Sequence, residues 1–284
     1  MKFGVVYNTA SYGTDPDQLV AVARQAEACG FESFCLTEHI VMYSGATLGG
    51  APIPPALPFA DPLACLSFAA AATSRILLGT AVLLLPYHHP VTLAKRLATI
   101  DVLSKGRMRM LTVGVGALPG EAAAVGVDFG TRGRRADEAI DVLRLLWAGD
   151  EDGVSYDGEF FSFSGLCSYP KPWHASTLPV HVGGSSRAAA RRAGLRGDGY
   201  FPGGGLTEQE RAHQIELMRS TAQAAGRDAG ALEVTRWVSS GLAAGEAQAH
   251  AEAGVTRLVF ASAAPDLPGR IDELSAFADR LGLG

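Results

Sequence analysis

The chain has 284 residues, of which 48% are hydrophobic and 19% are charged, and its formal net charge is −5. This composition supplies a substantial buried core and excludes a disordered chain, while the acidic balance gives no reason to expect nucleic acid as a partner. No apolar run approaches the roughly 20 residues of a membrane span, and the first residues read as a strand rather than a signal peptide. The four cysteines (Cys29, Cys35, Cys65 and Cys167) lack metal-ligand spacing, which indicates reduced thiols in a cytoplasmic protein.

Apolar runs typical of buried parallel strands alternate with helical patterns along nearly the whole chain. The strands are predicted over Phe3–Tyr7, Phe31–Leu36, Ile76–Val82, Met108–Gly114, Pro179–Val182, Gly199–Phe201, Leu232–Val238 and Arg257–Phe260. The helices after them are predicted over Asp15–Cys29, Asp61–Thr73, Pro90–Ser104, Arg134–Trp147, Ser186–Leu195, Thr207–Ala225, Glu246–Ala253 and Arg270–Leu281. Eight strand–helix units in this length predict a TIM (β/α)8 barrel, which typically needs about 250 residues, rather than a doubly wound sheet. No boundary is visible, so residues 1–284 are predicted to form a single domain.

Three segments stand outside the strand–helix alternation. Residues 37–60 contain three glycines and four prolines, and are predicted to be a long mouth loop without regular structure. Between about 149 and 178, residues Val154–Phe163 alternate around Asp157-Gly158, which predicts a β-hairpin inserted before strand five. The stretch Glu121–Val125 is predicted to be a single helical turn.

Catalytic groups of a barrel come from the C-terminal ends of its strands. Among the predicted strand ends only Thr37-Glu38-His39 carries a clear acid/base pair, so Glu38 and His39 are the first catalytic candidates. The alternative is a polar strand end with His39 merely hydrogen-bonded in the rim. The lysines lie away from these ends, which argues against a Schiff-base aldolase, and the chain has no metal-ligand pattern. A mouth poor in ionisable groups and rich in glycine indicates a bound cofactor.

The stretch Gly183-Gly184-Ser185-Ser186 lies between a predicted strand and a helix, where free backbone N–H groups and the helix dipole suit a phosphate. The alternative is an ordinary glycine-rich turn with a serine N-cap. His88 and His89 precede Pro90 and are interpreted as residues at a helix start rather than catalysts. The mouth loops are apolar and nearly uncharged, which favours a small to medium, fairly apolar organic substrate.

Six motifs occur in order along the chain: Thr37–His39, Gly79–Val82 with the later Pro90, Gly114–Gly116, Pro179–Ser185, Gly197–Pro202 and Gly254–Phe260. With these motifs the chain resembles the bacterial luciferase-like monooxygenase superfamily, and within it the actinobacterial oxidoreductases that use the deazaflavin coenzyme F420. The resemblance implies a TIM barrel with a tricyclic ring at its mouth, usually as a homodimer. The segment after Gly116 departs from the pattern, because it is about two residues shorter and lacks the Gly-Trp and acidic-aromatic pairs of many relatives.

The resemblance also implies roles for individual residues. It places a non-prolyl cis peptide at Ala81–Val82 behind the ring, a cofactor contact at Glu38, and a proton donor or substrate-orienting group at His39. Tyr43 matches an aromatic residue of the substrate pocket in some relatives. The cofactor-binding positions are then Glu38, Ala81, Val82, Gly114, Gly183, Gly184 and Ser185.

Together these features predict an F420-dependent oxidoreductase that transfers a hydride between the deazaflavin and an organic substrate, with His39 assisting proton transfer. The nearest alternative is an FMN-dependent monooxygenase that uses reduced flavin and O2. Two further alternatives are a non-catalytic flavin- or deazaflavin-binding protein and a cofactor-free barrel isomerase. The expected partners are a small-molecule substrate, a second copy of the chain and a separate cofactor reductase, with no nucleic acid and no membrane.

Overall fold

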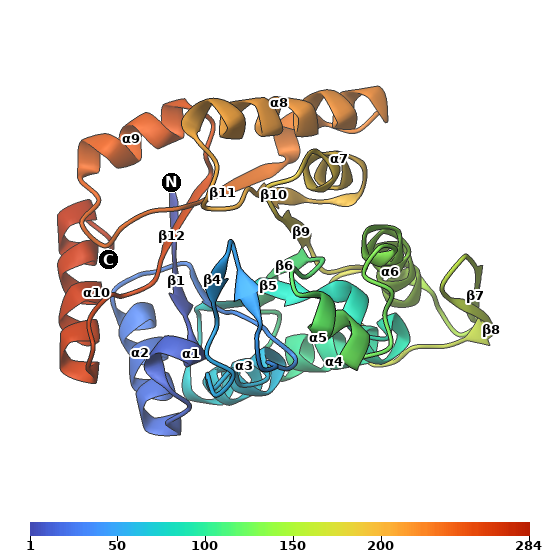
Figure 1. Cartoon of the computed structure of the whole chain (residues 1–284), viewed down its shortest axis with the longest axis horizontal. Coiled ribbons are helices and arrows are strands. Elements are labelled where there is room, and N and C mark those ends of the chain that lie inside the picture. The colour runs from blue at the N-terminus through green and yellow to red at the C-terminus, as the bar shows by residue number, and fades with distance from the viewer.

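The computed structural model describes residues 1–284, and its centre is a closed barrel of eight parallel strands (Figure 1). The barrel strands are β1 (Lys2–Tyr7), β2 (Ser33–Leu36), β5 (Leu77–Leu84), β6 (Met108–Gly114), β9 (Val180–Gly183), β10 (Gly199–Phe201), β11 (Glu233–Trp237) and β12 (Arg257–Phe260). They follow one another around the barrel in chain order, each neighbouring pair is parallel, and β12 closes the barrel against β1. The predicted TIM barrel is therefore confirmed.

Eight helices surround the barrel (Figure 1): α2 (Pro16–Ala28), α3 (Pro62–Ala72), α4 (Pro90–Leu103), α6 (Arg132–Ala148), α7 (Arg187–Arg196), α8 (Glu208–Ala224), α9 (Ala244–Glu252) and α10 (Leu267–Leu281). Each begins and ends within three residues of its prediction. Local sequence explains several starts, since Asp15 and Asp61 accept backbone N–H groups and are each followed by a proline at the first helical position. Thr207 and Glu210 form a reciprocal capping box at the start of α8.

The barrel interior is filled by side chains, so it is not a channel. Val6, Cys35, Met110, Phe201 and Val259 from five strands form a small buried cluster, separate from the larger core between strands and helices. Nearer the N-terminal end of the barrel, the guanidinium of Arg257 is 2% exposed and bonds to the carboxylates of Glu32 and Glu233. A polar pocket of about 300 Å³ borders Arg257 at this end, whereas the strand ends that carry the predicted site residues lie at the opposite mouth.

The predicted hairpin insertion is present, as β7 (Val154–Asp157) paired antiparallel with β8 (Ser162–Leu166), and it projects from the barrel next to α6 (Figure 1). Its connection is longer than the Asp157-Gly158 pair predicts. Residues 158–161 form the loop, and the Gly158 N–H donates to the Phe161 carbonyl at 2.9 Å. The carboxylate of Glu138 in α6 accepts the N–H groups of residues 159, 160 and 161, which explains why this wider loop is held.

The prediction that residues 37–60 lack regular structure is wrong in one place. Two short strands, β3 (Thr47–Leu48) and β4 (Ala51–Pro52), pair only with each other, because Gly49 and Gly50 both adopt the positive φ angles that a tight hairpin turn requires. Four further short helices join the elements: α1 (Thr9–Tyr12), η1 (Leu85–Tyr87), α5 (Pro119–Ala124) and η2 (Ala229–Ala231). Among all these helices, none combines the length and the apolar character needed to span a membrane.

Candidate active site

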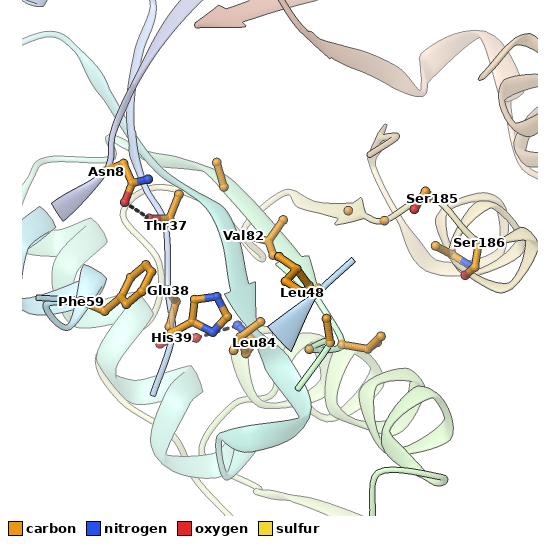
Figure 2. A pocket seen from close by; sticks show the side chains of 18 residues that line it. Asn8, Thr37, Glu38, His39, Leu48, Phe59, Val82, Leu84, Ser185 and Ser186 are labelled. Carbon is orange, nitrogen blue, oxygen red and sulfur yellow. Dashed lines mark hydrogen bonds between the residues drawn. The ribbon is translucent and has the colours of Figure 1, made fainter. Parts of the chain in front are cut away.

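A cavity of about 500 Å³ opens at the C-terminal ends of β1, β2, β5, β6 and β9 (Figure 2). Leu48 from the β3–β4 hairpin and Phe59 from the end of the same long loop complete its wall. Eight of the nine residues that sequence analysis assigned to the site line this one cavity: Glu38, His39, Ala81, Val82, Gly114, Gly183, Gly184 and Ser185. The C-terminal face of the barrel is therefore the place where the predicted residues meet.

His39 is held on two sides at the cavity wall. Its Nδ1 lies 3.1 Å from Oε2 and 3.3 Å from Oε1 of Glu121, a fully buried carboxylate in α5. The ring of Phe59 packs edge-on against the imidazole, with ring centroids 4.7 Å apart. Nε2 of His39 makes no hydrogen bond with the protein, so this nitrogen is the one left for a ligand.

Glu38 borders the cavity, but its carboxylate is already engaged. Oε2 accepts the backbone N–H of Leu84 at 2.6 Å, and His88 Nε2 lies 3.0 Å from Oε1. The residue is 4% exposed. Glu38 therefore links the end of β2 to the end of β5 by a hydrogen bond, and the contact with His88 holds the same carboxylate in place.

The wall between His39 and the glycine turn is formed by the end of β5. The peptide bond between Ala81 and Val82 is cis, as the resemblance implies, and the pairing of β5 with β6 shifts register at this point. The Val82 side chain lies between two glycines, because a Cβ on Gly114 or Gly183 would come within 2.6 or 2.5 Å of its methyl groups. Glycine at both positions lets Val82 stand against the cavity (Figure 2).

The glycine turn after β9 presents free backbone donors. Gly184 has φ +127°, which favours glycine, and its carbonyl accepts the hydroxyl of Tyr200 at 2.8 Å. Burial raises the pKa of Tyr200 to about 12, so this hydroxyl remains a donor. The N–H groups of Ser185 and Ser186 have no partner within the chain, while Ser186 Oγ caps α7 by accepting from Ala189. Free amides at the start of a ten-residue helix suit a phosphate.

Tyr43, which sequence analysis assigned to the substrate pocket, does not line the cavity. Its ring packs on Gly120, whose N–H donates to the tyrosine hydroxyl at 3.3 Å, so Tyr43 contacts α5 outside the cavity. Glycine at position 120 is the physical reason, because a Cβ there would come within 2.5 Å of the Tyr43 ring. Phe59 and Leu48 supply the apolar surface at the cavity instead.

No lysine or arginine lines the cavity. Arg132 lies nearby, but its Nε donates to the Gly116 carbonyl at 3.2 Å and its guanidinium stacks 3.5 Å above the Phe129 ring. The cavity therefore offers an anionic group backbone N–H groups and uncharged polar side chains rather than a lysine or an arginine.

Sequence analysis missed two site residues, Glu121 and His88. Glu121 falls in a stretch predicted only as a helical turn, and it meets His39 from 82 positions away. His88 was interpreted as part of a helix start, although the residue at the N-cap position of α4 is His89. The available signal was position, since both follow barrel strands at the C-terminal face.

Comparison with known proteins identifies the family of this chain. A family model described as luciferase-like monooxygenase matches residues 1–280. An uncharacterised protein of Mycobacterium tuberculosis is 35% identical over 303 residues, which cover 99% of this chain and 97% of that protein. An F420-dependent glucose-6-phosphate dehydrogenase of Microbacterium testaceum is 31% identical over 205 residues, which cover 71% of this chain and 56% of that enzyme.

Solved structures share the same fold. One is an F420-dependent secondary alcohol dehydrogenase in complex with an F420-acetone adduct, with a TM-score of 0.80 over 99% of both chains. Its sequence identity to this chain is 19%, so the likeness concerns the fold.

Proposed function

Because this chain belongs to the luciferase-like monooxygenase family, we propose that it is an oxidoreductase that uses coenzyme F420 and a small, neutral organic substrate. The placement of His39 carries this assignment, since its unbonded Nε2 faces the same cavity as the free amides after β9. Figure 2 supports the arrangement, with His39 and Ser185 on separate parts of the wall and Val82 between them in the view.

The residues present fit a phosphate-bearing tricyclic cofactor. The Ser185 and Ser186 N–H groups and the start of α7 would hold its phosphate, and the Ala81–Val82 wall would support the flat ring. Glu38 and His88 would fix that wall by anchoring Leu84. When bound, the deazaflavin supplies or accepts a hydride.

His39 would move the accompanying proton. In alcohol oxidation, His39 Nε2 would accept the proton of the substrate hydroxyl as the substrate carbon loses a hydride and a carbonyl forms. In the reverse direction, protonated His39 would donate its proton to the carbonyl oxygen as the carbon gains a hydride. An imidazole suits both directions near neutral pH.

The substrate class follows from the charge of the wall. With the Ser185 and Ser186 N–H groups assigned to the cofactor phosphate, no lysine or arginine lines the rest of the cavity to pair with the dianion of a phosphorylated sugar, so we propose a neutral alcohol or carbonyl compound instead. The glucose-6-phosphate activity in the name of one relative is therefore not carried over to this chain.

A fluorescence titration of the cofactor-free protein with F420, and separately with FMN, tests the cofactor. We expect at least tenfold tighter binding of F420. Tighter binding of FMN would favour a flavin monooxygenase, binding without turnover of any donor would favour a carrier protein, and binding of neither would contradict the phosphate site.

We also propose that the protein is a homodimer joined through α3. This helix has no charged side chain, and it leaves Phe68 52% exposed next to α4, whose last residue Leu103 is 72% exposed. The substitution Phe68→Glu should convert a particle of twice the chain mass into a monomer, as measured by light scattering. Leu195→Glu on α7 is the control, because Leu195 is comparably exposed at 46% and should leave the dimer intact. A monomeric unmodified protein would contradict this interface.

The cysteines fit a reducing compartment, and we propose a cytoplasmic location. All four thiols are unpaired in the structure, and burial raises the pKa of Cys35 to about 12, which makes it unreactive.

A further inference from the structure

We propose that Glu121 is a positioning residue that fixes the proton of His39 on Nδ1 and so leaves Nε2 free toward the substrate. The inference rests on the proposed role of His39, but its test reads the imidazole directly and needs neither cofactor nor substrate. The observation behind this proposal is that the Glu121 carboxylate is buried and has few hydrogen-bond partners.

The Glu121 carboxylate has only two donors within reach. It is fully buried, it accepts the Ile40 N–H at 2.6 Å through Oε1, and it lies 3.1 Å from His39 Nδ1 through Oε2. No lysine or arginine forms an ion pair with it. A buried carboxylate is costly unless it is hydrogen-bonded, and an ionised one can only accept. Nδ1 of His39 must therefore carry the hydrogen in this pair.

Two other contacts keep the imidazole from turning away from the carboxylate. Phe59 packs edge-on against the His39 ring. The Glu121 carboxylate also accepts the N–H of Ile40, the residue after His39, so it fixes the backbone next to His39 together with the His39 side chain. Glu121 itself does not line the cavity. It therefore acts through His39 and does not touch the substrate.

The tautomer decides what His39 is able to do. A neutral imidazole with its hydrogen on Nδ1 presents the lone pair of Nε2 and accepts a proton from an alcohol. The other tautomer presents an N–H there and cannot act as the base. Without the carboxylate, both tautomers are open to the ring. In serine proteases, an amide in place of the carboxylate behind the histidine lowers turnover by about 10⁴-fold because the tautomer is wrong.

The substitution Glu121→Gln tests this directly, because the shape is nearly unchanged. The glutamine carbonyl retains the Ile40 N–H, and its NH2 group then faces Nδ1 as a donor. Long-range ¹H–¹⁵N NMR spectra of histidine-labelled protein, recorded where the imidazole is neutral, report the tautomer of each ring. The His39 signals are assigned as those missing from His39→Gln.

In the unmodified protein we expect the hydrogen on Nδ1, and in Glu121→Gln we expect it on Nε2, with the melting temperature retained. The matched control is Glu138→Gln, which changes a carboxylate that binds only backbone N–H groups of the β7–β8 loop and should leave the His39 tautomer unchanged. If Glu121→Gln does not fold, Glu121→Asp supplies the conservative variant, and it should retain the Nδ1–H form.

An unchanged tautomer in folded Glu121→Gln would overturn the proposal, as would an Nε2–H form in the unmodified protein. With a substrate in hand, turnover by Glu121→Gln should fall about 10²–10⁴-fold while KM changes little. If no substrate is ever turned over, the proposed function fails, but the NMR result still decides the role of Glu121.

Discussion

Replacing His39 with alanine should lower turnover about 10²–10⁴-fold, which is the contribution of one well-placed general acid or base. The reason is geometric, because His39 presents the free nitrogen of a fixed imidazole to the cavity. The variant should still fold and should bind F420 with nearly unchanged affinity, since the proposed phosphate donors lie on the turn after β9. Stopped-flow absorbance of the deazaflavin measures the turnover, and the fluorescence titration measures the binding.

His89→Ala is the matched control for that experiment. His89 precedes α4, packs against the Phe161 ring and does not line the cavity, so its removal should leave turnover within about twofold of the unmodified value. Equal turnover by His39→Ala and the unmodified protein would rule out the proton-transfer role.

Replacing Arg257 with alanine should reduce the free energy of unfolding by about 3–5 kcal/mol, as measured by urea denaturation. The Arg257 guanidinium is 2% exposed and bridges Glu32 and Glu233 from β12, so its loss leaves two carboxylates at the closed end of the barrel with Lys2 as their remaining cation. Because a whole domain is stable by only about 5–15 kcal/mol, this loss is a large fraction. Arg134→Ala is the control and should leave the free energy of unfolding nearly unchanged, because its pair with Glu159 is exposed on both sides.

The same site makes stability depend on pH. Burial acts to raise the pKa of Glu233, but hydrogen bonds and charges from Lys2 and Arg257 outweigh it and lower the pKa to about 2. The folded pKa lies below the unfolded one, so this stabilisation is present above about pH 4.5 and is lost as pH falls toward 2. The stability difference between the unmodified protein and Arg257→Ala should therefore be constant from about pH 7 to about pH 5 and should narrow as the pH falls from about 4.5 toward 2. A difference that stays constant over this acidic range as well would contradict the assigned ion pairs.

Most of the fold could be predicted because each element has its own local signal. Strand β6 has the predicted bounds, and Asp15 and Thr207 cap the helices that follow them. The errors arise where the backbone departs from regular geometry. Strand β5 runs two residues past the predicted Val82, because a register shift at the cis peptide lets pairing with β6 resume. The loop of the β7–β8 hairpin is set by Glu138, which belongs to another element.

The site was predictable where a residue lies at a strand end, as Glu38 and His39 do. The site was not predictable where a residue, such as Glu121, contacts a site residue that is distant in the sequence. Nothing in the sequence near Glu121 indicates His39 as its partner, since the loops after β2 and β6 meet only once both strands pair with β5. Tyr43 was placed wrongly for the same reason, because its position depends on the packing of Gly120.

The β3–β4 hairpin allows the shape of the pocket to change independently of the barrel and of His39. Its strands pair only with each other, yet Leu48 at its turn borders the cavity and is 52% exposed. Changes in the length or side chains of the hairpin therefore alter the shape of the pocket without disturbing the pairing of any barrel strand or the bonds of His39. A descendant of this chain can thus acquire a new substrate by mutation in the hairpin alone, while it inherits its proton chemistry unchanged.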